Sequence, residues 1–155
     1  MDDSGIKKLL CKVEKRGFMI KQGGRRKNWR KRWFVMNPTT LLYFKDPNDG
    51  EPCGIVPLEH LTVSKHADGK RKFCIMLKPD QDKPLTSHKL NGGNISKGFH
   101  ECFLFCVPTE PEQNNWAESL KTNIQRNLFY ERLKNRAPET VKNRRNSVMI
   151  AAPKK

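Results

Sequence analysis

The chain has 155 residues, of which 35% are apolar and 30% charged, and its net charge is +15. This length and composition predict one soluble domain with short extensions. No apolar run is long enough to span a membrane, and the N-terminus lacks a signal-peptide pattern, so we expect a cytoplasmic protein. The five cysteines are scattered without a Cys-x-x-Cys pair, which predicts reduced thiols rather than a disulfide framework.

The positive charge is concentrated at the two ends of the chain. Residues 1–35 contain twelve Lys and Arg against three Asp and Glu, and residues 121–155 contain ten against two. Residues 33–120 contain nine against eleven. A nearly neutral body with basic ends indicates attraction to a polyanion, either nucleic acid or an anionic membrane surface.

Short β-rich runs separated by turn-forming residues predict an antiparallel barrel or sandwich. The stretch 78–99 contains two prolines and the sequence "NGGN", and we expect it to be an irregular loop or insertion. The expected strands are 17–22, 29–36, 41–44, 53–58, 61–64, 73–77 and 100–107.

The periodicity then changes to that of a helix. Thr109 and Glu112 form a capping box, with a proline in the first turn. Apolar residues follow at four-residue steps and predict one buried stripe that closes an end of the barrel. The helix is expected to end near Arg136, before Pro138, and a basic disordered tail to follow. The stripe consists of Trp116, Leu120, Ile124 and Leu128.

The stretch "KQGGRRKNWRKRW" (21–33) contains seven cations and no acid. Alternate side chains of a strand share a face, so Arg30 and Arg32 point one way, and Lys31 points the other way with the two tryptophans. Lys21 lies across the expected hairpin, and Lys21, Arg30 and Arg32 should converge. Such a cluster suits a compact polyphosphate, because arginine binds phosphate oxygens in pairs.

The loop of this hairpin adds further donors. Gly23 and Gly24 allow the backbone to approach an anion closely, so that N–H groups can donate to it. Arg25 and Arg26, together with Lys31, are expected mainly to attract an anionic surface.

A lysine at the end of the first strand, followed by basic-x-Arg in the second, resembles the phosphoinositide signature of pleckstrin homology (PH) domains. "KQGGRRKNWRKRWFVM", "LLYF" and "EPCGIVPLEHL", with the helix tryptophan, are similar to the cytohesin version. "FYERLKNR" (129–136) resembles the polybasic helix that follows the cytohesin domain. The resemblance covers roughly residues 15–136 and does not include the exchange domain that cytohesins carry upstream.

The resemblance implies a mainly β PH fold, with a seven-stranded antiparallel barrel of two orthogonal sheets capped by a C-terminal α-helix. The expected organisation is an N-terminal segment (1–14), the PH domain (15–127), and a helical extension with a basic tail (128–155). It also implies that residues 129–136 can fold back over the lipid pocket. The expected head-group residues are Lys21, Gly23, Gly24, Lys27, Arg30, Arg32, Tyr43, Lys89 and His100, with His88 as an alternative to Lys89.

Two positions depart from the cytohesin pattern. Cys53 replaces a ligand-contacting arginine, and Phe99 replaces an asparagine. Each lost contact would cost about 1–3 kcal/mol if it is buried against the ligand. We therefore expect that the affinity or the preference among phosphoinositides can differ from that of cytohesins. The two-glycine loop resembles the cytohesin form that is selective for phosphatidylinositol 3,4,5-trisphosphate.

The leading interpretation is a non-catalytic module that binds a phosphoinositide and is recruited from the cytoplasm to the plasma membrane. The cytohesin resemblance adds a small GTPase of the Arf type as a partner. The alternatives are a nucleic-acid binder and a protein-interaction module with isomer-blind membrane affinity. "RRNS" resembles a basophilic kinase site and makes Ser147 a candidate for phosphorylation.

No catalytic spacing or phosphate-binding loop motif is present in the sequence, and we expect neither an enzyme nor a cofactor. His100, Cys102 and Cys106 share a predicted strand face. A metal site is not expected there, because three residues on one strand rarely converge on a tetrahedral ion.

Overall fold

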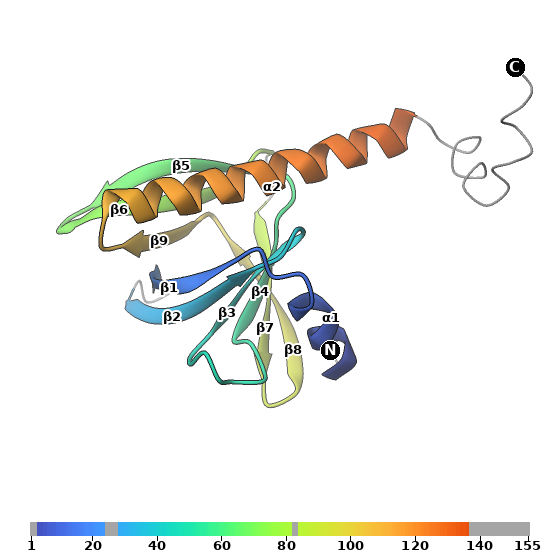
Figure 1. Ribbon diagram of the computed structural model, residues 1–155, viewed down its shortest axis with the longest axis horizontal. Coiled ribbons are helices and arrows are strands. Elements are labelled where there is room, and N and C mark those ends of the chain that lie inside the picture. The colour runs from blue at the N-terminus through green and yellow to red at the C-terminus, as the bar shows by residue number, and fades with distance from the viewer. Residues whose placement is uncertain (1–2, 24–27, 82–83, 137–155) are drawn as a thin grey trace, which may run out of the picture.

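The computed structural model describes residues 3–23, 28–81 and 84–136. Within these residues, nine strands form one antiparallel sheet that curls into an open barrel, and two helices pack against it (Figure 1). The strands are β1 (Lys15–Gln22), β2 (Trp29–Met36), β3 (Thr40–Phe44), β4 (Gly54–Pro57), β5 (Leu61–Asp68), β6 (Arg71–Pro79), β7 (Leu85–Asn91), β8 (Asn94–His100) and β9 (Phe103–Val107). The helices are α1 (Asp3–Leu10) and α2 (Glu110–Arg136).

The strand order is β5-β6-β9-β1-β2-β3-β4-β7-β8. β5 and β8 are therefore the two edges, and α2 packs across β5, β6 and β9. The expected mainly β architecture with a C-terminal helix is confirmed. The described strands form one continuous curled sheet of nine strands rather than seven strands in two sheets, and the additional strands come from the segment expected to be irregular.

The expectation for residues 78–99 was wrong, because this segment forms the β7–β8 hairpin. The two strands pair from Leu85 opposite His100 to Asn91 opposite Asn94. Gly92 and Gly93 at the turn have positive φ angles of 57° and 85°, a conformation that glycine adopts without strain. β8 is exposed on most of its length, so its sequence lacks the apolar alternation that marks a half-buried strand.

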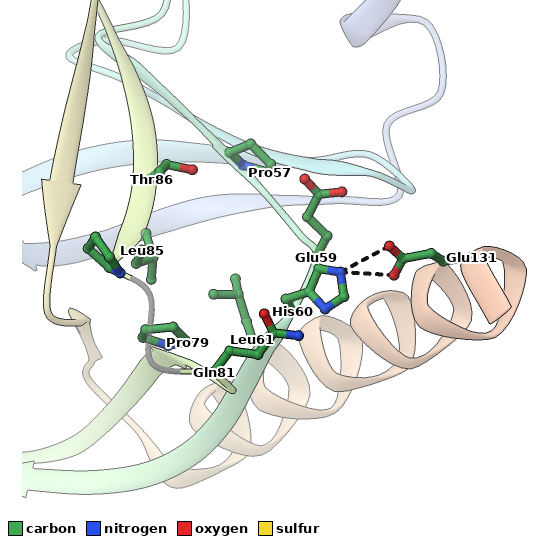
Figure 2. Close-up of a pocket in the computed structure, with 10 residues that line it drawn as sticks. Pro57, Glu59, His60, Leu61, Pro79, Gln81, Leu85, Thr86 and Glu131 are labelled. Carbon is green, nitrogen blue, oxygen red and sulfur yellow. Dashed lines mark hydrogen bonds and ion pairs between the residues drawn. The ribbon is translucent and has the colours of Figure 1, made fainter. Parts of the chain in front are cut away.

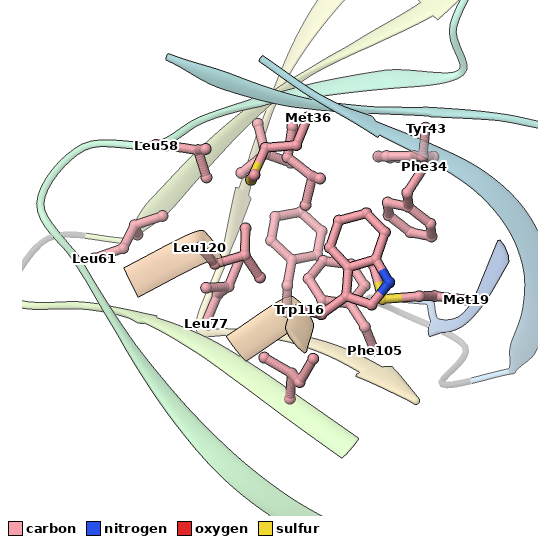
Figure 3. Packing of buried hydrophobic residues seen from close by; sticks show 14 of the residues in the cluster. Met19, Phe34, Met36, Tyr43, Leu58, Leu61, Leu77, Phe105, Trp116 and Leu120 are labelled. Carbon is pink, nitrogen blue, oxygen red and sulfur yellow. The ribbon is translucent and has the colours of Figure 1, made fainter. Parts of the chain in front are cut away.

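The main core lies between the inner face of the sheet and α2 (Figure 3). Trp116, Leu120 and Ile124 are buried, which confirms the predicted stripe, and Leu128 is half-buried. Thr109 caps the helix as predicted, since the backbone N–H of Glu112 donates to its hydroxyl at 3.4 Å, and this hydroxyl is 3.1 Å from the Glu112 carboxylate, to which it donates. The sheet contributes Met19, Phe34, Leu41, Val56, Ile75, Leu77 and Phe105 to this core, among others.

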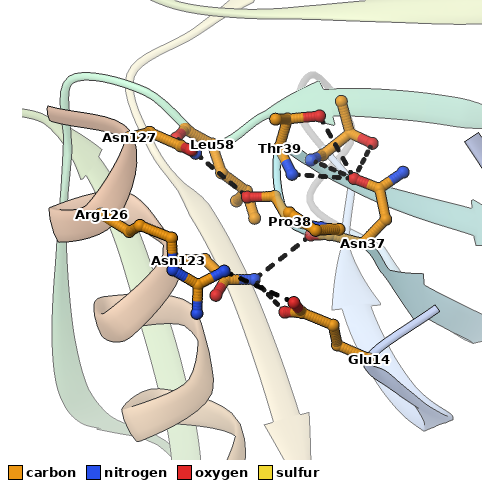
Figure 4. A network of polar contacts seen from close by, with 9 residues as sticks. Glu14, Asn37, Pro38, Thr39, Leu58, Asn123, Arg126 and Asn127 are labelled. Atoms are coloured by element: carbon orange, nitrogen blue, oxygen red, sulfur yellow. Dashed lines mark hydrogen bonds and ion pairs between the residues drawn. The ribbon is translucent and has the colours of Figure 1, made fainter. Parts of the chain in front are cut away.

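Asparagine side chains fix α2 to the rest of the barrel (Figure 4). The amide of Asn123, which is 2% exposed, donates to the Glu14 carboxylate at 2.8 Å and to the Asn37 carbonyl at 3.2 Å. Asn127 donates to the carbonyls of Pro38 at 3.2 Å and Leu58 at 2.8 Å. Three of these four bonds satisfy backbone carbonyls that are buried or partly buried, and together the bonds set the position of the helix along the barrel.

Helix α1 covers part of the outer face of the sheet. Leu9 and Leu10 pack against a second cluster that includes Leu42, Phe44 and Ile55. The Asn37 amide donates to the Leu9 carbonyl at 2.8 Å and connects this helix to the β2–β3 turn. The segment before β1 is therefore integrated into the fold.

One expectation about cysteine was wrong. Cys74 on β6 and Cys106 on β9 lie directly opposite one another and form a disulfide. The two cysteines are 32 positions apart in the sequence, so no local motif predicted the bond. They meet because β6 and β9 pair in this register. Cys11, Cys53 and Cys102 are free.

Neither α1 nor α2 is both long and apolar enough to cross a bilayer.

Candidate functional site: a cationic pocket

A pocket of about 620 Å³ opens between the end of the β1–β2 hairpin and the β7–β8 hairpin. The described residues that line it include no aspartate or glutamate. They include five cations from four different strands or strand ends: Lys21, Arg30, Arg32, Lys45 and Lys89.

The β1–β2 hairpin positions three of these cations. Lys21 pairs with Arg30 across the hairpin, and Met19 pairs with Arg32. Met19 lies in the core, so the alternation of strand side chains directs Lys21, Arg30 and Arg32 to the inner face. At the base of the loop, the Gly23 N–H donates to the Asn28 carbonyl at 2.7 Å. The structure thus brings Lys21, Arg30 and Arg32 together in the lining of one pocket.

A row of paired residues crosses the sheet toward Lys89. Tyr43 on β3 pairs with Gly54 on β4, Gly54 pairs with Lys89 on β7, and Lys89 pairs with Ser96 on β8. The Tyr43 ring lies where a side chain at position 54 would stand, so only glycine fits there. The tyrosine and Lys89 therefore line the same pocket, as expected from the resemblance.

Lys21 is an unusually buried cation. It is 9% exposed, and its ammonium group lies 5.0 Å from the ring centre of Tyr43 and 5.1 Å from that of Phe103. Burial lowers the pKa of Lys21 to about 8, and the nearby charges of Lys89 and Arg32 contribute in the same direction. Burial also raises the pKa of Tyr43 to about 12, so its hydroxyl keeps its proton at neutral pH.

His100 lies beside the pocket rather than in its lining. It ends β8 instead of starting the last strand, because residues 101 and 102 form the corner before β9. Its ring nitrogen is 3.1 Å from the Ser87 hydroxyl. Burial lowers the pKa of His100, followed by the charges of Lys21 and Lys89.

The neighbouring cavity that His100 lines has a volume of about 740 Å³ and shares Gly23, Lys89 and Ser96 with the cationic pocket. Phe99 also lines this cavity and is exposed.

The opposite face of the hairpin has a different character. The Lys31 ammonium lies 4.5 Å from the ring centre of Phe18, and Trp33 packs edge-on against the same ring at 4.8 Å. The Arg71 guanidinium covers Trp29 at 4.6 Å. Both tryptophan rings therefore have intramolecular partners, and both are half-buried.

Several predicted residues lie outside the described part of the chain: Gly24, Arg25, Arg26, Lys27 and Ser147. The prediction did not place Asn28, Asn91 and Ser96 in the site, and all three line the pocket. Their positions depend on the β7–β8 hairpin and on the closing of the β1–β2 hairpin. The "NGGN" turn is a hairpin signal in the sequence from which the positions of Asn91 and Ser96 could have been predicted.

The arrangement is suited to a compact, highly charged anion. Two guanidinium groups can each donate paired bonds to phosphate oxygens, and the three lysines add point charges. Within the described residues, no group of three or more His, Cys, Asp or Glu could hold a metal ion.

A family model described as "PH domain" matches residues 13–125. An ankyrin repeat, PH and SEC7 domain containing protein, secG, from Dictyostelium discoideum is 41% identical over 133 residues, covering 85% of this chain and 13% of that protein. Cytohesin-4 from Mus musculus is 34% identical over 144 residues, covering 90% of this chain and 37% of its own length. The chain thus spans a minor part of these relatives.

Solved structures show the same fold. The PH domain of ORP8 superposes with a TM-score of 0.59 at 17% identity, over 74% of this chain and 97% of that chain. The Slm1 PH domain in complex with inositol 4-phosphate gives a TM-score of 0.55 at 21% identity, over 73% and 97%. The C-terminal PH domain of pleckstrin, in complex with an inositol pentakisphosphate, gives 0.52 at 19% identity, over 72% and 98%.

Proposed function

Because this chain belongs to the family of PH domains, we propose that its cationic pocket binds the head group of a polyphosphorylated inositol lipid. The observation that carries this proposal is the presence of five cations and no acid among the described residues that line one pocket of about 620 Å³. The solved PH domains of Slm1 and pleckstrin, in complex with inositol phosphates, support the ligand class.

Binding would recruit the protein to an anionic membrane from the cytoplasm. A pocket ligand supplies specificity, and exposed cations such as Lys31 add nonspecific attraction to the lipid surface. The PH fold is a binding module, so no catalytic step is proposed for this domain. Gly24, Lys27 and His100 belong to the proposed head-group set by their cytohesin-like positions, whereas Arg25 and Arg26 are proposed to face the membrane.

The finer assignments rest on the resemblance to cytohesins. They are phosphatidylinositol 3,4,5-trisphosphate as the preferred lipid, the plasma membrane as the target, and a small GTPase of the Arf type as a partner. Cys53 lines the pocket where cytohesins carry an arginine, and it is the position at which the preference would differ. Phosphorylation of Ser147 in the basic tail would weaken membrane attraction.

Helix α2 does not cover this pocket. It continues without interruption to Arg136, and Glu131 contacts His60 at the other end of β4. The expectation that residues 129–136 fold back over the lipid site is therefore not met in this structure (Figure 1).

Calorimetry of the full chain against soluble inositol phosphates tests the proposal. Wild type should discriminate between isomers of equal charge, and Arg32→Ala should lose at least tenfold in affinity, as expected for a charge-assisted contact. Lys31→Ala is the matched control, because it removes one charge from the adjacent residue on the opposite face of the strand. Equal binding of all isomers, or equal losses in both variants, would reject a specific pocket.

A further inference from the structure

A second cavity, of about 390 Å³, shares no lining residue with the cationic pocket and lies at the other end of β4 and β7. Figure 2 shows the residues that line it. β7 connects the two sites, with Leu85 and Thr86 in this cavity and Lys89 to Asn91 in the cationic pocket. The nearest of these residues, Thr86 and Lys89, are three positions apart, and Leu85 and Asn91 are six, so the two sites lie about 10–20 Å apart along the strand. This distance is at least comparable to the Debye length of about 8–10 Å near physiological salt.

This cavity carries acidic side chains, in contrast to the basic side chains of the cationic pocket. Glu59 and Glu131 line it, and Asp80 lies next to it with its carboxylate 3.9 Å from the His60 ring. No lysine or arginine is present among the described lining residues. In a chain with a net charge of +15, an acidic hollow of this kind is a local exception and indicates a cationic partner.

The walls of the cavity are apolar. Three proline rings, Pro57, Pro79 and Pro84, line it together with the side chains of Leu61 and Leu85, and both leucines are buried. Apolar walls below a rim of carboxylates match a side chain with a methylene stem and a cationic end. Arginine fits this description best, because its planar guanidinium can also engage a carboxylate with two parallel bonds.

One side of the cavity is held in place by His60. This residue has a positive φ of 55°, an uncommon backbone conformation for a residue with a side chain. Its Nε2 lies 2.9 Å and 3.1 Å from the two carboxylate oxygens of Glu131 on α2, and its carbonyl accepts a bond from the Asp80 N–H at 2.9 Å. The wall is therefore formed before any ligand arrives, which reduces the entropy lost on binding.

Glu59 has no such partner among the described residues. It is exposed at the rim, and neither a hydrogen bond nor an ion pair joins its carboxylate to another described side chain. Glu131, by contrast, already shares its two oxygens with His60. Glu59 is thus the acceptor that remains available to an incoming guanidinium.

We propose that this cavity docks an arginine side chain from a partner protein, presented in a peptide segment with aliphatic neighbours. The arginine stem lies against the proline rings, and its guanidinium pairs with Glu59 while the charge of Glu131 adds attraction. The aliphatic neighbours cover the apolar rim. This interaction is independent of the cationic pocket and does not require the proposed lipid function.

The test is an NMR titration of the full, isotope-labelled chain with the acetylated peptide Leu-Arg-Leu and its neutral isostere Leu-citrulline-Leu. The arginine peptide should shift the amide signals of Leu61, Thr86 and Glu131 in a saturable manner. Glu59→Gln should weaken its binding about tenfold, as expected for one charge-assisted bond. Glu118→Gln, which removes the same charge from an exposed position on α2, should leave binding unchanged.

Equal binding of the citrulline peptide, or equal losses in the two variants, would overturn the proposal. Absence of shifts at the cavity would also overturn it. If deletion of residues 137–155 alone shifted the same cavity signals without peptide, the pocket would belong to the chain's own basic segment, and a partner protein would be rejected as its occupant.

Discussion

If the pocket binds a head group as proposed, the lowered pKa of Lys21 makes that binding depend on pH above neutrality. In the protein without ligand, Lys21 has a pKa of about 8, because burial and the neighbouring cations disfavour its charged form. A bound polyphosphate favours the charged ammonium and raises that pKa. Binding above pH 8 must therefore be accompanied by uptake of a proton, whereas binding at pH 7 requires almost none.

The size of the effect follows from the pKa. At pH 9, about one tenth of the free protein carries a charged Lys21, so the affinity should be about tenfold lower than at pH 7. This corresponds to about 1.4 kcal/mol. His100 is not expected to contribute, because its pKa is lowered and it is already neutral at pH 7. The ligand phosphates are also largely ionised above pH 7.

The same pKa affects the stability of the unliganded protein. The unfolded chain holds the proton on Lys21 up to about pH 10.5, whereas the folded protein releases it near pH 8. Stability should therefore rise with pH between about 8 and 10.5, as the cost of burying the charge disappears. Ligand affinity and stability change in opposite directions over this range.

Calorimetry with inositol 1,3,4,5-tetrakisphosphate measures the effect directly, at pH 7 and pH 9 in pairs of buffers with different ionisation enthalpies. Proton uptake should rise from near zero to almost one per ligand. Lys31→Met, on the exposed face, serves as the control and should keep the pH dependence, whereas Lys21→Met should lose it together with much of the affinity. Equal affinities at both pH values without proton uptake would refute the reasoning.

Two further predictions concern the framework of the site. Gly54→Ala would place a methyl group against the Tyr43 ring, and we expect a loss of about 1–3 kcal/mol in unfolding free energy with weaker head-group binding, measured by urea denaturation and calorimetry. Gly50→Ala, where nothing stands in the way, should be nearly neutral. Reduction of the Cys74–Cys106 disulfide should lower the unfolding free energy by about 3–4 kcal/mol, given the sequence separation of 32 between its cysteines. Reductant should have no such effect on the Cys74→Ala/Cys106→Ala variant, and an equal shift there would argue against the bond.

The sequence predicts most reliably those elements whose side chains follow a simple period. In α2, the burial of Trp116, Leu120 and Ile124 follows from four-residue spacing, and its start follows from the pairing of Thr109 with Glu112. The face shared by Arg30 and Arg32 follows from strand alternation in the same way. In each case, the prediction depends only on residues that lie close together in the sequence.

Features that depend on register between distant strands could not be predicted from the pattern of residues along the chain, and Lys89 was expected in the pocket only from the family resemblance, with His88 as an alternative. Lys89 enters the pocket because β7 pairs with β4 at Gly54, and Cys74 meets Cys106 because β6 pairs with β9. The β7–β8 hairpin itself was missed, since β8 is largely exposed and carries no apolar alternation. Only the turn residues Gly92 and Gly93 marked it locally.

The positions of the two cavities determine how the domain would be oriented at a membrane. The lining of the cationic pocket comes from the ends of β1 and β7, and that of the acidic cavity from the start of β7, the end of β4 and the distal part of α2. If the cationic pocket engages an anionic membrane, the acidic cavity faces away from that membrane. The lipid surface would then neither cover the cavity nor repel its carboxylates. A partner that carries arginine could therefore bind the domain while it is held at the membrane, and the two interactions would add without competing for a residue.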